Sequence, residues 1–319
     1  MTLIYQKVFI FLILNKFIRL LMNWSTAITN YKNYLKIERS LSSNSIENYE
    51  YDIQRFLKYL KHKKIKISPI DVNSDLIKSF IYDISKKVST RTQSRIISGL
   101  KSFFKYLVFE DYLETNPVEL IDSPKIGRKL PDTLTTNEID QLISSIDLSH
   151  PQGERNRCII ETLYSCGLRV SELVNLKISD FFFEEGFIKV TGKGNKQRFV
   201  PIDPNTQKYI NLYINSIRNK IDVKNEFSDI LFLNRRGKQL TRAMIFTIVK
   251  QLTEKSGLQK KISPHTFRHS FATHLLQNGA DLRSIQLMLG HESITTTEIY
   301  VHLDRSHLKS IIEKYHPRR

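Results

Sequence analysis

The sequence predicts a mainly α-helical protein with two domains and a small β-sheet in the C-terminal domain. Apolar residues recur at helical spacing over residues 22–121, and this spacing stops at residues 122–132. An alternating segment with two glycines follows in the second half of the chain. A chain of 319 residues is long enough for two domains with real apolar cores.

The chain carries a formal net charge of +17, spread along its length and not confined to one tail. A surplus of this size favours a polyanionic partner. Nucleic acid is the first candidate and an acidic membrane surface is the second. A generally basic proteome would give the same surplus and remains an alternative on composition alone.

The two cysteines, Cys158 and Cys166, lie in an apolar helical stretch and lack the CxxC spacing of a metal site. We expect buried, reduced thiols that act as small hydrophobic side chains. The absence of a disulfide pattern in the sequence fits a reducing cytoplasm.

Residues 1–21 resemble a signal peptide or membrane anchor, with an apolar run from Val8 to Leu14. The run is too short, since spanning a bilayer takes about 20 uninterrupted apolar residues, and no small-residue cleavage site follows it. Met22 opens a stretch of ordinary globular character. We expect translation to start at Met22, residues 1–21 to be a mis-assigned or dispensable leader, and no membrane attachment.

Residues 22–121 are predicted to form a bundle of about four helices. One apolar stripe runs from Tyr49 to Leu60, with Ser45 as its expected N-cap. A second long helix is expected from about Thr92 to Glu110. Shorter helices are expected near residues 28–37 and 76–84. Lysines occupy most of the remaining faces, which fits a solvated surface or one that grips a polyanion.

Residues 122–132 contain two prolines, one glycine and three basic residues, which is typical of an interdomain linker. The second domain, residues 133–319, begins with a helix capped at Thr136 or Asn137. Helices near residues 151–165 and 171–176 come next.

The segments FIKV and RFVPI alternate apolar and polar residues, and the glycine-containing turn TGKGNKQ joins them. This pattern predicts a β-hairpin. From Pro204 to about Tyr315 the spacing indicates helices again.

Arg169 and Lys193 are the first candidate site residues. Arg169 follows a glycine that would end one helix, and Ser171 could cap the next, so the guanidinium could reach an anion at a helix N-terminus. A plain surface arginine is the commoner outcome. Lys193 lies in the hairpin turn, where an ammonium group is either solvated or able to reach into a groove.

His265 and Arg268 lie three residues apart in the first turn of a helix that Ser263 and Pro264 are expected to start. An imidazole, a guanidinium and backbone N–H groups would then meet at the positive end of a helix, which suits a phosphate. Metal binding is the alternative. No acidic residue or cysteine stands at ligand spacing, so we expect no metal site.

His291 follows a glycine, and Tyr300 comes nine residues later. A tyrosine in a helix is more often a core aromatic with a tethered hydroxyl than a reactive group. None of these candidates is decisive when taken alone, but their order along the chain is informative.

That order closely resembles the catalytic set of the tyrosine recombinase (integrase) family: Arg169, Lys193, His265, Arg268, His291 and Tyr300. The motifs GLRxSEL, HxxRHSFATHLL and LGHxSIxTTxIYxH agree in spacing as well. The resemblance covers the chain from Met22 onward. Within the family, the chain looks most like the Xer recombinases of bacterial chromosomes, and more like the XerD branch than the XerC branch. Residues 1–21 are its one departure.

The resemblance implies a two-domain, C-shaped DNA clamp, with residues 22–121 as a SAM-like core-binding domain and residues 133–319 as the catalytic domain. It implies a 3′-phosphotyrosyl intermediate formed by Tyr300, without metal, nucleotide or other cofactor. It also implies roles for the remaining residues: His265 as base, Lys193 as acid, Arg169, Arg268 and His291 as phosphate ligands, and Glu172 as a support for them.

The implied partner is a double-stranded DNA recombination site, bound by a homo- or hetero-tetramer with a second Xer recombinase. Strand exchange would pass through a Holliday junction, resolve chromosome dimers at cell division and respond to an FtsK-type DNA translocase. In the family, the terminal helix docks on a neighbouring protomer through an apolar face, here Leu308, Ile311 and Ile312. Packing of this helix on its own domain is the alternative.

Three other functions remain open on the sequence. An integrase of a phage or mobile element would share the chemistry, and so would a type IB topoisomerase. A catalytically inactive DNA-binding protein could use the same fold. The complete set of six residues argues against an inactive protein, and the Xer-like N-terminal domain argues against a topoisomerase.

Overall fold

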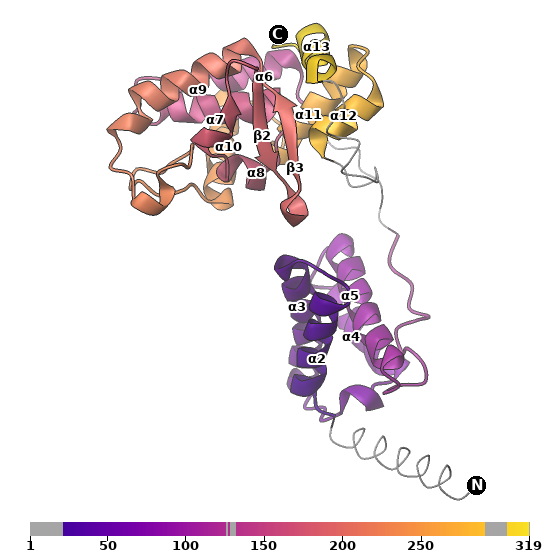
Figure 1. The fold of residues 1–319 in the computed structure, drawn as a ribbon. Coiled ribbons are helices and arrows are strands. Elements are labelled where there is room, and N and C mark those ends of the chain that lie inside the picture. Colours follow the sequence, from indigo (N-terminus) through magenta and orange to yellow (C-terminus); the bar gives the residue numbers. More distant parts are fainter. Residues whose placement is uncertain (1–21, 126, 128–131, 291–304, 319) are drawn as a thin grey trace, which may run out of the picture. The chain divides into compact units, whose positions relative to one another are not determined.

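The chain divides into two compact units, residues 1–128 and 129–319 (Figure 1). The computed structural model describes residues 22–125, 127, 132–290 and 305–318. Within these residues each unit has its own apolar core, the protein is mainly helical, and its one sheet has three strands, which confirms the predicted fold class. Residues 1–21, to which the leader prediction refers, lie outside the described residues. None of the described helices is both long and apolar enough to cross a bilayer.

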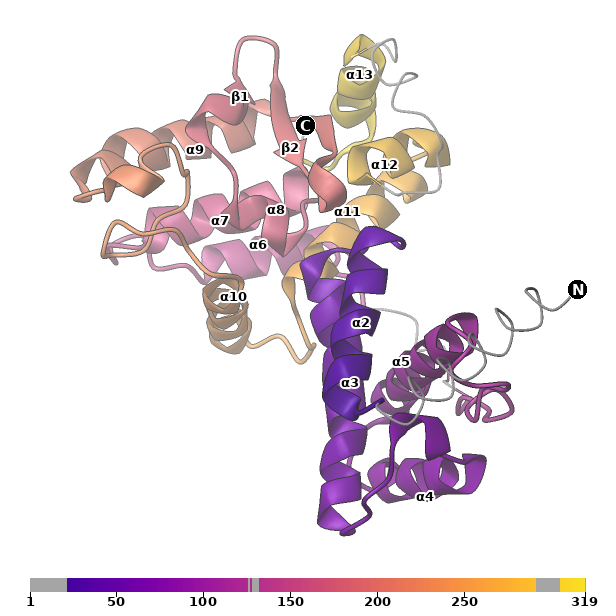
Figure 2. The same cartoon turned by 60° about the horizontal axis from the view of Figure 1, so that its bottom comes forward.

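The described residues of the N-terminal unit form a bundle of four α-helices (Figure 2). In the stripe predicted on α3, Ile53, Phe56 and Leu60 are buried, and Tyr49 and Leu57 are half-buried. Helix α3 packs against α2 and α5, and α4 packs against α5. The bounds are α2 Trp24–Ile37, α3 Ser43–His62, α4 Ser74–Ser85 and α5 Thr90–Phe109.

The prediction that Ser45 is the N-cap of α3 is wrong, because the N-cap position belongs to Ser42. The Ser45 hydroxyl lies 3.0 Å from the Ser42 hydroxyl and sits inside the first turn. Serines at 42, 43 and 45 are equally good capping residues by type, so residue type alone could not select the one whose backbone is extended.

Helices α3 and α5 approach closely at Gly99. Asp52 on α3 is 2% exposed and accepts a hydrogen bond of 2.7 Å from Arg95 on α5. A Cβ atom at Gly99 would lie 2.7 Å from the carboxylate oxygen of Asp52 and 2.9 Å from its Cβ. The helix therefore needs a residue without a side chain at this position.

We predict that Gly99→Ala destabilises the N-terminal unit by about 1–3 kcal/mol through overpacking, although alanine normally favours a helix over glycine by about 1 kcal/mol. Urea unfolding followed by the fluorescence of Trp24 measures this unit, because Trp24 is the only tryptophan and its indole donates to the Ile67 carbonyl. The matched control is Ser98→Ala at the exposed neighbour. An unchanged or raised midpoint for Gly99→Ala would contradict the prediction.

In the C-terminal unit helix α7 is largely buried, and a small sheet lies beside helices α12 and α13 (Figure 1). Helix α7 packs against α8, α9 and α11, while α12 and α13 pack against strand β3. The α-helices among its described residues are α6 Thr136–Ser144, α7 Gly153–Ser165, α8 Val170–Val174, α9 Pro204–Ser216, α10 Arg242–Ser256, α11 Pro264–Gln277, α12 Leu282–Leu289 and α13 Arg305–Tyr315.

The predicted hairpin is confirmed. Strand β2 (Phe187–Thr191) pairs antiparallel with β3 (Gln197–Pro201), and a short 3₁₀ turn over Lys193–Asn195 joins them. Strand β1 (Phe181–Phe182) adds an edge of two residues, which is too short to give an alternating pattern.

The cap predicted for α6 is displaced by one residue. Thr135 is the N-cap, and it forms a capping box with Glu138: the Thr135 N–H donates to the carboxylate at 2.8 Å, and the Glu138 N–H donates to the threonine hydroxyl at 3.2 Å. Cys158 and Cys166 are buried and free, as predicted.

Residues 217–241 are largely irregular, and the prediction of continuous helices after Pro204 is wrong for this segment. It contains two short 3₁₀ turns and two isolated β-bridges. Arg218 is 6% exposed and donates hydrogen bonds to the carbonyls of Ser228 and Ile230, which holds the segment folded back on itself. Residues 231–233 are consecutively buried, a pattern that an amphipathic helix does not produce.

Helix α13 packs on its own unit. Leu308, Ile311 and Ile312 belong to the core cluster of the C-terminal unit, so in this single chain the helix packs on its own domain, and docking on a neighbouring protomer stays a prediction. The end of the chain holds this arrangement: Arg318 pairs with Asp140 at 2.6 Å and lies 3.4 Å from a carboxylate oxygen of Glu161.

Candidate active site

Arg169 lies at the junction between α7 and α8. Helix α7 ends at Ser165, and Gly167 adopts a positive φ of 56°, as the predicted helix-ending glycine requires. Arg169 occupies the N-cap position of α8, and its backbone N–H donates to Glu172 Oε2 at 2.8 Å. Ser171 lies inside α8, so the prediction that it caps the helix is wrong. No side chain caps α8 in the way predicted for Ser171; instead the Glu172 carboxylate, three residues beyond the N-cap, accepts from the N-cap N–H.

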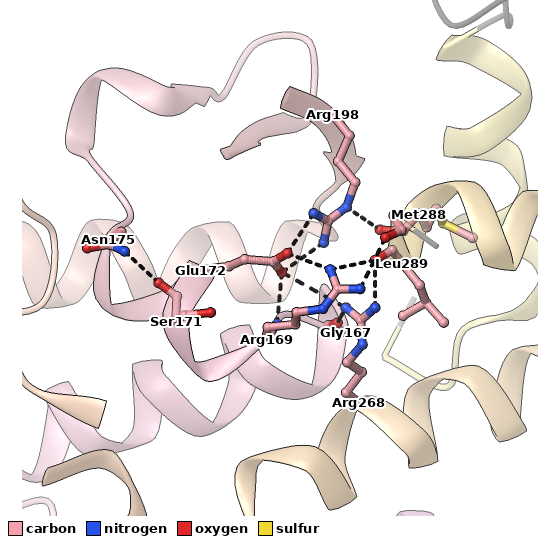
Figure 3. Close-up of polar contacts among 10 residues, drawn as sticks. Gly167, Arg169, Ser171, Glu172, Asn175, Arg198, Arg268, Met288 and Leu289 are labelled. Atoms are coloured by element: carbon pink, nitrogen blue, oxygen red, sulfur yellow. Dashed lines mark hydrogen bonds and ion pairs between the residues drawn. The ribbon is translucent and has the colours of Figure 1, made fainter. Parts of the chain in front are cut away.

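Glu172 is the centre of a buried cluster of charges and is 3% exposed (Figure 3). Arg169 Nη1 donates to its Oε1 at 2.8 Å. Arg198 donates from Nη1 to Oε1 and from Nη2 to Oε2, both at 2.9 Å, so this pair is bidentate. Arg268 Nη1 lies 3.9 Å from Oε2. Three guanidinium groups thus surround one carboxylate, which leaves an excess of positive charge.

The same arginines bind the last carbonyls of α12. Arg198 Nε donates to the Met288 carbonyl at 2.7 Å (Figure 3). The Leu289 carbonyl accepts from Arg169 at 3.1 Å and from Arg268 at 2.6 Å. Carbonyls at a helix C-terminus lack partners within the helix and carry a partial negative charge, so cations stabilise them. The cluster therefore joins α8, α11, α12 and β3 at one point.

The Glu172 carboxylate and the Arg268 guanidinium both stay ionised at neutral pH. Burial raises the pKa of Glu172, but hydrogen bonds and charge from Arg198, together with hydrogen bonds from Arg169, outweigh burial and hold this pKa below its usual value. Burial and the charge of Arg169 lower the pKa of Arg268 to about 9, while Glu172 opposes the shift. A guanidinium with this pKa remains protonated near pH 7.

Arg169 and Arg268 retain donors that could bind an anion. A guanidinium has five N–H donors. The contacts made with described residues use three of those of Arg169 and two of those of Arg268. The Arg169 side chain is 32% exposed and that of Arg268 is 9% exposed. The arrangement provides two fixed, charged groups, one of which opens toward solvent.

Helix α11 begins as predicted, with Ser263 as N-cap and Pro264 as the first helical residue. Arg268 turns inward, where its Nη1 donates to the Gly167 carbonyl at 2.7 Å. His265 is exposed on the same first turn. The structure brings Arg268 into the cluster and leaves His265 beside the start of the helix.

The remaining predicted site residues are described only in part or lie outside the described residues. The backbone of Lys193 lies in the hairpin turn. The turn begins against the cluster, because a Cβ atom at Gly192 would lie 3.4 Å from Glu172 Oε1. His291 and Tyr300 lie outside the described residues. His291 directly follows Gly290, the C-cap of α12.

No group of three or more His, Cys, Asp or Glu side chains among the described residues could hold a metal ion. The expectation that the site lacks a metal stays a prediction, because two of the candidate residues are not described.

Two family profiles match the chain. The profile "Phage integrase family" matches residues 132–307, more than half of the chain. The profile "Phage integrase, N-terminal SAM-like domain" matches residues 28–111. The chain belongs to the phage integrase family.

Proteins named tyrosine recombinase XerD are similar to this family member over nearly their whole length. The protein from Oceanobacillus iheyensis is 43% identical over 298 residues, which cover 92% of this chain and 98% of the relative. That from Staphylococcus haemolyticus is 39% identical over 295 residues, 92% of this chain and 99% of the relative. The prediction of a tyrosine recombinase that is most like the XerD branch is confirmed.

A solved structure also resembles the chain. The XerH site-specific recombinase bound to palindromic difH substrate, in a post-cleavage complex, is 27% identical with a TM-score of 0.66. The match covers 89% of this chain and 83% of that one. A lambda integrase dimer bound to a COC′ core site, 18% identical with a TM-score of 0.67, shares the fold of this recombinase.

Arg198 is the residue of the cluster that sequence reasoning missed. It lies in RFVPI, whose alternating pattern predicts only a strand, and its register partner across the hairpin is Val190. The only sequence signal for Arg198 is that it is a charged residue in a short alternating strand that directly follows a glycine-rich turn. Such a residue is usually a solvated arginine, so the sequence alone did not single it out.

We predict that Glu172→Gln destabilises the C-terminal unit by about 3–5 kcal/mol at pH 7, because it leaves buried guanidinium groups without their counter-ion. The pKa of Glu172 is lowered in the folded state from its usual 4.5. Its contribution to the free energy of unfolding is therefore fully present above pH 4.5 and is lost as the pH falls through the lower folded-state pKa.

Calorimetry of wild type and Glu172→Gln from pH 7 to pH 3 checks this prediction. The difference in unfolding free energy should be largest at neutral pH and should narrow below pH 4.5. Trp24 fluorescence reports the other unit and should not change. Glu185→Gln, at an exposed glutamate, is the matched control. A difference that is constant with pH would contradict an ionised Glu172.

Proposed function

We propose that this recombinase cleaves and rejoins double-stranded DNA at a specific site through Tyr300, and that it resolves chromosome dimers at cell division. Site-specific tyrosine recombination is the activity of the family to which the chain belongs. The observation that carries the proposal is the buried cluster in which Glu172 fixes Arg169 and Arg268, while both guanidinium groups retain N–H donors that could bind a phosphate.

In the proposed reaction, the Tyr300 oxygen attacks the phosphorus of the scissile phosphodiester. The bond to the 5′-oxygen breaks and a 3′-phosphotyrosyl link forms. A phenol has an ordinary pKa of about 10, so attack at neutral pH needs a base, for which His265 is the candidate. Lys193 protonates the leaving 5′-oxygen as general acid. Reversal of these steps with another 5′-hydroxyl reseals the strand.

Arg169 and Arg268 hold the non-bridging oxygens of the phosphate, and His291 donates a hydrogen bond to the same group. Negative charge on these oxygens must be stabilised throughout phosphoryl transfer, and donors that are already fixed do so without reorganisation. The hydrogen bonds to Glu172 and to the end of α12 supply this rigidity. The phosphotyrosyl bond conserves the energy for rejoining, so neither metal nor nucleotide is needed.

DNA binding and multimeric assembly follow from the similarity to XerH, whose substrate in the solved complex is palindromic difH. A palindromic site mirrors a two-fold arrangement of protomers. We propose a homo- or hetero-tetramer with a second Xer recombinase, acting in the cytoplasm and activated by an FtsK-type DNA translocase. The net charge of +17 suits the DNA partner.

The proposed domain roles are a core-binding domain at residues 22–121, a linker at 122–132 and a catalytic domain at 133–319. The boundary between the two compact units falls inside the proposed linker. The matched range 28–111 lies within the proposed core-binding domain, and the matched range 132–307 lies within the proposed catalytic domain apart from residue 132, the last residue of the linker.

The test is a covalent-trapping assay with the full-length chain. Nicked duplexes from a genomic library are incubated with the protein in EDTA, denatured with detergent, and the DNA attached to protein is sequenced. We expect attachment through a 3′-phosphate at one recurring, near-palindromic site. Binding without attachment would indicate an inactive DNA-binding protein. Relaxation of a supercoiled plasmid that lacks the recovered site would indicate a topoisomerase.

A further inference from the structure

We infer that Arg198 is a positioning residue for this reaction: it locks the end of α12, the hairpin turn and Glu172 into one unit. The inference rests on the proposed function for its consequence in catalysis, whereas its structural part can be tested without DNA. Arg198 lies on β3 with a side chain that is 9% exposed, so we place it behind the reacting groups.

One guanidinium makes three directional bonds to two elements. Its two Nη atoms donate to the two oxygens of Glu172, and its Nε donates to the Met288 carbonyl at 2.7 Å. Only a planar group with donors on both Nη atoms and on Nε can make all three bonds at once. A lysine keeps the charge but offers a single donor nitrogen, so it cannot bridge Glu172 and α12 in this way.

Two glycines lie against the Arg198 side chain. Gly290 has a φ of 64°, and a Cβ atom there would lie 3.1 Å from Arg198 Cδ and 3.3 Å from Nε. A Cβ atom at Gly192 would lie 3.6 Å from Arg198 Nη1. Arg198 therefore packs against the residue immediately before His291 and against the residue immediately before Lys193.

The three segments that Arg198 joins each lead to a proposed catalytic residue. Glu172 holds Arg169, the hairpin turn carries Lys193, and the end of α12 is followed by His291. At the end of α12, Arg198 donates to the Met288 carbonyl, whereas Arg169 and Arg268 donate to the Leu289 carbonyl. Without Arg198, α12 would keep bonds from the two phosphate-binding arginines but lose the one that ties it to the hairpin.

The decisive variant is Arg198→Lys in the full-length protein, with Arg198→Ala as a second variant. The matched control is Arg218→Lys. Arg218 is buried in the same unit and also makes three hydrogen bonds, but all of them go to the carbonyls of Ser228 and Ile230. Both substitutions cost stability, so the control separates loss of folding from loss of positioning.

Three measurements decide the inference. We expect Arg198→Lys to bind the recovered DNA site with unchanged affinity but to form the covalent adduct up to about 100-fold more slowly per folded molecule, as displaced reacting groups do. Without DNA, hydrogen exchange should become faster in the peptide over residues 285–290 and stay unchanged in α7. Arg218→Lys should change neither the adduct rate per folded molecule nor the exchange of residues 285–290.

Two results would overturn the inference. The first is hydrogen exchange over residues 285–290 that stays at the wild-type rate in both Arg198 variants. The second is a rate of adduct formation per folded molecule that is the same for Arg198→Lys as for Arg218→Lys. Failure of the proposed function would look different. In that case the wild-type protein itself would form no adduct, while the exchange experiment would still decide whether Arg198 holds the end of α12.

Discussion

Replacing Tyr300 with phenylalanine is expected to abolish covalent attachment to DNA while leaving DNA binding intact. The substitution removes one oxygen atom and keeps the aromatic ring, so only the proposed nucleophile is lost. Removal of a nucleophile from an otherwise intact site typically lowers the rate by about 10⁴-fold or more. The measurement is the amount of detergent-resistant adduct on a nicked substrate, compared with the affinity for the intact site.

A second tyrosine in the same region supplies the control for this experiment. Tyr315 ends α13, and its carbonyl accepts a hydrogen bond of 2.6 Å from Asn278. Because that contact uses the backbone, Tyr315→Phe should form adduct at the wild-type rate. If Tyr300→Phe forms as much adduct as wild type, one of the other 13 tyrosines or another residue is the nucleophile, and the proposed mechanism is wrong.

Removal of Arg268 should have the second largest effect on the rate of cleavage. An arginine that neutralises the transition state of phosphoryl transfer is worth about 10³- to 10⁵-fold. We expect a loss in this range for Arg268→Ala, and a smaller loss for Arg268→Lys. Lysine keeps the charge but cannot donate to the Gly167 and Leu289 carbonyls and to a phosphate in the same geometry. Single-turnover cleavage at saturating DNA measures the effect.

A neutral phosphate analogue separates charge neutralisation from structural support. A methylphosphonate at the scissile position replaces one charged non-bridging oxygen with a methyl group. If Arg268 neutralises this oxygen, the loss caused by Arg268→Ala should be much smaller on the analogue than on ordinary DNA. An equal loss on both substrates would instead indicate that Arg268 acts only by holding Gly167 and α12 in place.

The elements that were predicted well are those whose signals are local. The hairpin over residues 187–201 and the start of α11 at Pro264 each depend on residues close in sequence: an alternating pattern, a glycine turn, or a serine followed by proline. The errors were equally local. Ser42, Thr135 and Arg169 occupy the N-cap positions assigned to neighbours, because several residue types can cap and backbone geometry selects among them.

Residues 217–241 could not be assigned correctly, and the packing partner of α13 could not be chosen, because both depend on distant contacts. Arg218 folds the first segment by binding carbonyls up to twelve residues away. The apolar face of α13 suits a neighbouring protomer as well as its own core, and the pattern of Leu308, Ile311 and Ile312 is the same in both cases.

The sequence by itself determined the order and types of the proposed catalytic residues, the two-domain helical fold and the hairpin that carries Lys193. Only the tertiary structure decided that Arg169, Arg268 and Arg198, which are separated by up to 99 positions, meet at Glu172 and at the last turn of α12. The reason is physical. A buried carboxylate and the unpaired carbonyls of a helix end both need cations, and which arginines supply them depends on how α8, β3, α11 and α12 pack.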